Sequence, residues 1–245
     1  MNPIEQLLSD LELIVRETLA LKHRAGYFAA IYRQVTVEVR TRIADGRFED
    51  NSRMIRFAAL FGSRYVDAYR SFRAGRDITG AWRVALANAT SGTLIILQDL
   101  LLGINAHVNL DLGVSAAAIG LQGLKNDFEQ LNDVISGLTD RAQAAINHFS
   151  PALGVLDFLG GRTDEQIVNF SLGVAREDAW HSAVLLTATP TAGLEAAIRA
   201  IDRRAALVAR RVAEPGFPFA SAVSVVRLSE SSDVAGIIRA LDTLA

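Results

Sequence analysis

The chain has 245 residues, which is the upper range of a single domain and enough to bury a large core. It contains no cysteine, and this excludes disulfides, thiolate metal sites and cysteine nucleophiles. Its formal net charge of −2 gives no overall attraction to nucleic acid or to an anionic membrane. Hydrophobic residues make up 50% of the chain and prolines number only five, a composition typical of helices.

The first part of the chain predicts four helices in succession. Apolar residues recur at helical spacing over residues 3–24, from about 27 to 45, and from about 53 to 72. Gly46 suits the end of the second helix, and the run 50–52 offers capping side chains for the third. A turn-rich break at 75–80 precedes a fourth helix that carries Trp82 and ends at Gly92.

A long apolar helix is predicted at about residues 93–119. It is long enough to span a bilayer, but Asp99 and Asp111 would each cost about 2.5–3.5 kcal/mol near the bilayer centre. We therefore expect no membrane span and instead an all-α, multi-helix bundle built around this buried central helix. Acidic residues occur early in the chain and no basic-then-apolar leader is visible, so a cytoplasmic protein is expected.

The second part predicts helices at about 126–150, 163–190 and 191–212, followed by a linker at 214–218. Residues 220–228 suggest a short strand or an irregular extended piece, and a last helix begins after Ser232. The expected organisation is a bundle domain at 1–213, with residues 214–245 forming a linker and a C-terminal helix that packs on the same domain.

The central helix carries polar side chains on two faces. His107 and Asp111 are four residues apart and share one face, while Asn105 and Asn109 lie almost opposite, with Gln98 further along. His107 is a candidate general base or metal ligand, Asp111 would orient it or share the metal, and Asn109 would assist. Asn105 and Gln98 would contact substrate. The alternative is a structural network in which these buried groups satisfy one another.

The segment around Asp178 and His181 is a second candidate part of the same site. Asp178 and His181 share a helical stripe with Val174 and Leu185, so they are expected to face inward, with Trp180 beside them at the substrate. Together with His107 and Asp111 they would hold one divalent metal, Zn or Fe. The alternative for this segment is a salt-bridged surface turn.

Arg64 and Asp67 form the third candidate segment. Arg64 could clamp an anionic group of a substrate, and Asp67 could be a buried acid or a ligand. The alternative is an ordinary exposed turn. Motifs for nucleotide-binding loops and for an α/β-hydrolase elbow are absent from the sequence.

The segment Leu97–Leu112 resembles a bacterial and fungal helical family known only as a domain of unknown function, by its Asn-Ala-His-x-Asn-x-Asp core. Tyr32–Thr36, Phe61–Asp67 and Arg176–Trp180 belong to the same resemblance. It implies a helical fold and a shared site but supplies no activity. The His-x-x-x-Asp spacing is also similar to that of zinc-dependent phospholipase C, whose N-terminal Trp ligand and additional histidines this chain lacks.

These features favour a small-molecule enzyme that acts on a hydrophobic or amphipathic substrate. The reaction would be that of a hydrolase or a lyase, either with a bound metal or without one. The competing expectation is a non-catalytic bundle that binds a ligand or a protein and uses its buried polar residues as a structural network.

Overall fold

The computed structural model describes residues 2–155 and 172–244, and all regular structure in those ranges is helical. The predicted all-α class is therefore confirmed. The first part contains α1 (Pro3–Ala20), α2 (Gly26–Ala44), α3 (Asn51–Arg73) and α4 (Gly80–Ser91). The central part contains α5 (Ile96–Ala106), the π-helix η1 (His107–Leu112), α6 (Gly113–Ile119) and α7 (Lys125–Phe149). The last described part contains α10 (Leu172–Ala188), α11 (Thr191–Ala213), α12 (Phe219–Ser229) and α13 (Val234–Leu241).

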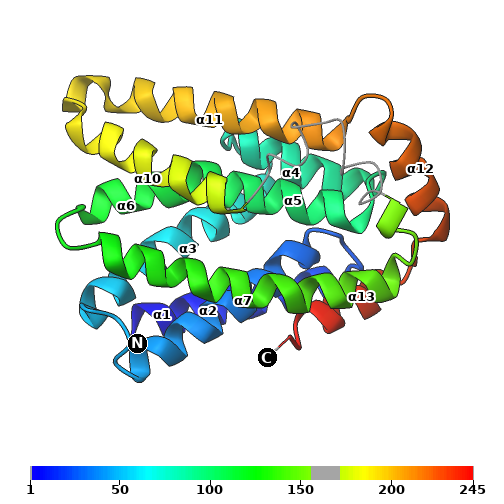
Figure 1. Ribbon diagram of the computed structural model, residues 1–245, viewed down its shortest axis with the longest axis horizontal. Helices are drawn as coiled ribbons and strands as arrows, with labels where there is room; N and C mark the ends of the chain where they lie inside the picture. The colour runs from blue at the N-terminus through cyan, green and yellow to red at the C-terminus, as the bar shows by residue number, and fades with distance from the viewer. Residues whose placement is uncertain (1, 156–171, 245) are drawn as a thin grey trace.

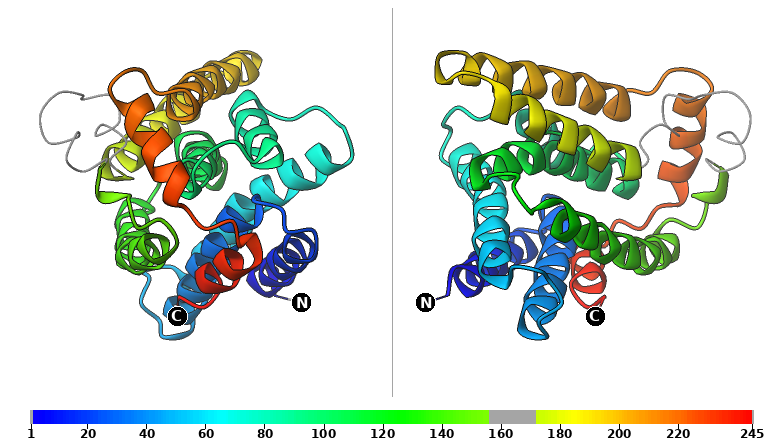
Figure 2. Two further views of the ribbon diagram at one scale, coloured as in Figure 1. Left: turned by 90° about the vertical axis from the view of Figure 1, so that its right-hand side faces the viewer. Right: turned by 60° about the vertical axis from the view of Figure 1, so that its left-hand side comes forward.

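The continuous run of α5, η1 and α6 lies in the middle of the bundle, between two groups of helices (Figure 1). On one side, α10 and α11 form an antiparallel pair, with α4 packed against both α11 and α5. On the other side lie α1, α2, α7 and α13, and α3 packs on η1 and α6 (Figure 2). The central run therefore contacts helices that precede it in the chain, such as α2 and α3, and helices that follow it, such as α10 and α11.

The long apolar stretch that the sequence shows is the buried central run of the bundle. The stretch Ile96–Ile119 is long and apolar enough to cross a membrane, but 78% of its most apolar window is buried inside the bundle. Helices on both sides cover it, so its apolar surface packs against protein.

Two glycines allow neighbouring helices to approach the central run closely. A Cβ atom at Gly103 would lie 2.5 Å from the ring of Phe28 on α2. A Cβ atom at Gly113 would lie 2.7 Å from the backbone oxygen of Ala179 on α10. These contacts set the positions of α2 and α10 on the central run, because a larger side chain would force the helices apart.

Carboxylates from distant parts of the chain satisfy backbone N–H groups at helix starts. Asp202 on α11 accepts from the N–H of Gly80 at 2.8 Å and of Ala81 at 2.9 Å, the first two residues of α4. The buried Asp127 on α7 accepts from the N–H of Glu49 at 2.7 Å, just before α3. At α4, whose N-cap Thr79 makes no side-chain cap, Asp202 replaces a local capping side chain, whereas the Asp127 contact adds to the local cap Asp50 of α3. Both contacts bind distant helices to one another.

The expectation of a strand or extended piece at residues 220–228 is wrong, because these residues form most of α12. Its buried residues Phe219, Ala222 and Val226 follow helical spacing, so packing on the bundle decides the conformation of a segment rich in valine. The first residues of the predicted 163–190 helix lie outside the described residues. α13 packs against α1, α2 and α7, while the predicted division at residue 214 stays a prediction.

Candidate functional site

The polar residues singled out in the sequence coincide with the π-helical segment η1. A π-helix is rare and usually occurs as a short insertion in an α-helix, often at a functional site. The structure confirms the two faces of the central run. His107 and Asp111 face α3 and α4, whereas Asn105 and Asn109 lie on the side of α11.

Asp111 is the hub of the first face. Its Oδ1 accepts from Arg64 Nε at 2.8 Å, and its Oδ2 accepts from Trp82 Nε1 at 2.8 Å. The same Oδ2 lies 3.2 Å from Nδ1 of His107. One buried carboxylate thus joins η1 to α3 and α4, and bonds to a charged acceptor are among the stronger ones in proteins.

The environment of His107 favours its neutral form. Burial lowers the pKa of the imidazole, and the charge of Arg64 acts in the same direction. The hydrogen bond and the charge of Asp111 oppose this effect but do not reverse it. In the neutral ring, Nδ1 carries the proton and donates a hydrogen bond to Asp111, which leaves a lone pair on Nε2.

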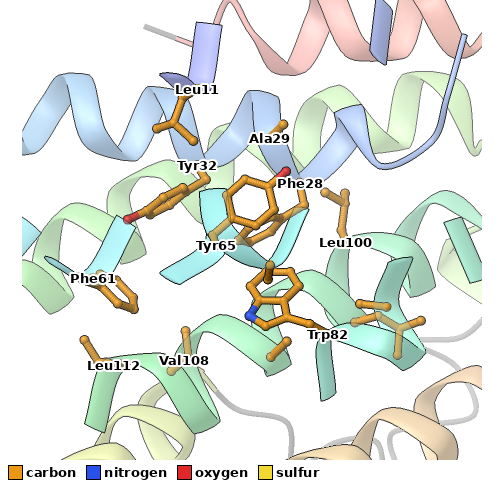
Figure 3. Close-up of a cluster of buried hydrophobic side chains, with 14 of the residues drawn as sticks. Leu11, Phe28, Ala29, Tyr32, Phe61, Tyr65, Trp82, Leu100, Val108 and Leu112 are labelled. Atoms are coloured by element: carbon orange, nitrogen blue, oxygen red, sulfur yellow. The ribbon is translucent and has the colours of Figure 1, made fainter. Parts of the chain in front are cut away.

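Aromatic rings enclose the imidazole, which is only 2% exposed. The ring of Phe61 stacks on it at 3.7 Å between centroids with an interplanar angle of 10°, and Tyr32 meets it edge-on at 4.3 Å. Phe28 and Trp82 complete the enclosure at 5.7 and 6.1 Å. Figure 3 shows these aromatic side chains gathered beside the helical turn that carries Val108 and Leu112.

Nε2 of His107 has no hydrogen-bond partner within the described part of the protein. Tyr32 and Phe61 also line a cavity of about 20 Å³ between α2, α3 and α7, whose other lining residues include Met54 and Leu131. This volume is far below the several hundred Å³ of a typical ligand pocket. The imidazole is therefore a free acceptor inside a nearly closed aromatic shell.

The second face holds α11. Asn105 donates to the backbone oxygen of Ala205 at 2.9 Å, and Asn109 donates to Oδ1 of Asn105 at 2.9 Å. Gln98 donates to the backbone oxygen of Val212 at 2.7 Å, near the end of α11. These three side chains, predicted to contact substrate or assist catalysis, are engaged by protein groups.

The expectation that Asp178 and His181 face inward beside His107 is wrong. Helix α10 does pack on the central run, but through its alanines, with Ala175, Ala179 and Ala183 buried. His181 is exposed, and Asp178 pairs with Arg204 of α11 at 2.7 Å near the surface. The close approach at Gly113 requires small side chains on the facing helix, and this requirement selects the alanine stripe.

The remaining predicted residues fall in different places. Asp67 is exposed, because the buried stripe of α3 runs through Phe61 and Tyr65 on the other side of the helix, so the buried-acid interpretation is wrong. Trp180 is half-buried, with Phe128 at 5.1 Å and the Lys125 ammonium 4.6 Å from its ring centroid. Among Arg64, Asp67 and Trp180, Arg64 is the residue that contacts the His107–Asp111 pair, through its hydrogen bond to Asp111.

In the described ranges, no group of three or more histidine and carboxylate side chains lies close enough together to hold a metal ion. The four predicted ligands are divided between the buried centre and the surface of α10. The sequence-based prediction also missed Trp82, the second donor to Asp111. A buried tryptophan needs an acceptor for its indole N–H, and this was the available signal.

The fold and the site define a helical-bundle protein with a buried His–Asp centre in a π-helical turn of its central helix. Residues 4–215 match the model of a family described as a family of unknown function, DUF5995, and the chain belongs to this family. The match covers the bundle from α1 through α11. Comparisons with curated proteins and with solved structures found no match.

Proposed function

We propose that this protein is a non-catalytic helical bundle that acts by binding a ligand or a protein, and that its His107–Asp111 centre is structural. The enclosure of the imidazole is the observation that carries the proposal. His107 is 2% exposed and its Nε2 is buried, so a substrate would reach Nε2 only if the surrounding side chains moved. Asp111 already serves Arg64, Trp82 and His107.

Such a centre has a clear structural use. A buried polar group that is satisfied in only one arrangement of the helices favours that arrangement over shifted ones. Asp111 does this for α3 and α4, and Asn105 does it for α11. Binding would then take place at the surface. A groove of about 700 Å³ between α1, α2 and the residues that follow α13 has the volume of a ligand site and is lined by charges of both signs, including Glu5, Arg40 and Asp242.

Chemical modification of the histidines tests the proposal. Diethyl pyrocarbonate, followed by mass spectrometry, should modify the exposed His148 and His181 of the folded protein and leave His107 unmodified until the protein unfolds. Modification of His107 at a rate similar to that of His181 would mean that the ring is accessible, and would contradict the proposal. A Phe61→Ala variant serves as the positive control, because it opens the stacked face of the imidazole.

A small-molecule enzyme is the second candidate, and one observation favours it. His107 has the arrangement of a general base, with Nδ1 directed at a carboxylate and Nε2 free. If a single zinc or iron ion were involved, Nε2 would be the available ligand atom. Elemental analysis of the purified protein and of His107→Ala tests the metal-dependent form of this candidate. Stoichiometric metal that the variant loses supports the enzyme, whereas a metal-free protein that the variant only destabilises supports the structural network.

A further inference from the structure

A second buried charged cluster lies at the other end of α5, around Arg24. Arg24 Nε is 2.8 Å from Oδ2 of Asp99, and its Nη2 is 3.6 Å from Oε2 of Glu230. Arg24 also donates to the backbone oxygen of Gly92 at 3.0 Å. The three charged side chains are largely buried, at 13%, 2% and 7% exposure for Arg24, Asp99 and Glu230. One arginine is therefore shared by two carboxylates inside the protein.

Glu230 caps the central helix from a distance of more than a hundred residues along the chain. The N-cap residue of α5 is Ile95, whose side chain has no acceptor. Both carboxylate oxygens of Glu230 lie 3.0 Å from the N–H of Ile96, the first residue of α5, and Ser150 at the end of α7 donates to Oε1. Glu230 thus accepts the hydrogen bond that an N-cap side chain would accept, and it places a negative charge at the positive end of the helix dipole.

Arg227 fastens the same junction. It donates to the backbone oxygens of Gly92 at 2.9 Å and Leu94 at 2.9 Å, and to that of Thr93 between them. The segment from α12 to α13, which lies beyond the residues matched by the family model, therefore holds the loop that precedes the central helix. We call the contacts of Arg227 and Glu230 with residues 92–96 the C-terminal clamp.

Protonation of Asp99 changes the number of negative charges that share Arg24. Burial, the largest effect, raises the pKa of Asp99 to about 7; Arg24 and Arg227 oppose the rise and Glu230 adds to it. Tyr27 also faces the cluster, and burial raises its pKa well above the usual range, so it stays neutral. With Asp99 ionised, two carboxylates repel each other and compete for Arg24. With Asp99 protonated, Arg24 is left to Glu230.

We infer that the C-terminal clamp is pH-sensitive, holding the central helix most firmly at low pH and loosening as the pH rises toward the value at which Asp99 ionises in the folded protein. The sign follows from linkage. A carboxyl group that binds its proton more tightly in the folded than in the unfolded chain stabilises the fold at low pH, and this contribution is lost as the pH rises toward the folded-state pKa, near 7. The inference is independent of the proposed function, since it concerns the other end of α5.

Hydrogen exchange measured by mass spectrometry tests the inference. After correction for the intrinsic exchange rate, opening of residues 92–99 and 227–238 should be about tenfold more frequent near pH 8 than near pH 6, the span over which Asp99 loses its proton. Asp99→Asn, which cannot ionise, should show equal protection at the two pH values. Asp67→Asn, which removes an exposed carboxylate, should behave like the wild type.

Equal protection of the wild type at the two pH values would overturn the inference, and so would an unchanged pH dependence in Asp99→Asn. Glu230→Gln provides a second test in case Asp99→Asn does not fold. This variant keeps an acceptor for the N–H of Ile96 and removes the charge that repels Asp99. The pH at which the segment loosens should then move to a lower value, and an unmoved transition would contradict the proposed role of Glu230.

Discussion

Asp111→Asn should destabilise the protein by about 4.5–6 kcal/mol. The change keeps the size of the side chain but places an NH₂ group where the carboxylate receives three donors. Loss of the charged acceptor for the Trp82 indole costs about 1.5–3 kcal/mol. Removing one partner of a fully buried ion pair costs about 3–5 kcal/mol. The side chain of Arg64 is 28% exposed and can regain water, so the lower end of that range applies.

Urea unfolding followed by circular dichroism measures this effect. The midpoint should fall while the denaturant slope stays unchanged, because the surface exposed on unfolding is the same. Asp67→Asn on α3 is the matched control and should leave the midpoint in place, since Asp67 is exposed. A loss below about 1 kcal/mol for Asp111→Asn would refute the view that this carboxylate holds α3 and α4 on the central run.

Three further outcomes are expected. Gly113→Ala should cost about 1–3 kcal/mol, because its Cβ would meet the backbone oxygen of Ala179, whereas Gly216→Ala, with open space around it, should be silent in the same urea titration. Asn105→Ala should cost about 1–3 kcal/mol by removing two hydrogen bonds, those to the oxygen of Ala205 and from Asn109, and an effect as small as that of the exposed Asn126→Ala would argue against the α11 contact. For His107→Phe, the difference in unfolding free energy from wild type should change with pH. Burial lowers the pKa of His107, so wild-type stability falls as the pH drops below about 6.5 and the variant lacks this loss; a difference that stays constant with pH would contradict the assignment.

The sequence predicted the central helix and its two polar faces well because both are local features. Residues four apart on a helix must share a face, and this rule placed His107 with Asp111 and Asn105 with Asn109. What each face contacts is not local. The partners of Asp111 come from α3 and α4, and the cap of α5 comes from the far end of the chain, so no spacing rule could identify them.

The prediction for α10 failed for a different physical reason. Hydrophobicity alone favours a stripe through Val174 and Leu185, yet these residues are exposed, and the smaller Ala179 is buried. The facing glycine on the central run decides the outcome, because a close helix–helix contact excludes large side chains however apolar they are. The metal site expected from the sequence required the stripe of Val174 and Leu185 to face the central run. Because α10 packs through its alanines instead, Asp178 and His181 lie away from His107 and Asp111.

The two buried clusters on the central run respond to pH in opposite directions. Acidification from neutral pH favours protonation of Asp99, which strengthens the start of α5, while it disfavours the neutral imidazole that the shell around His107 requires. The two contributions partly cancel in the free energy of unfolding of the wild type. A free energy that changes little between about pH 5 and 7 would therefore not mean that Asp99 and His107 leave stability unaffected. Because the groups lie at opposite ends of one helix, residue-resolved exchange can separate what global unfolding combines. Protection should rise near residue 96 and fall near residue 107 as the pH is lowered, and a uniform change along the run would mean that the central helix opens as one unit.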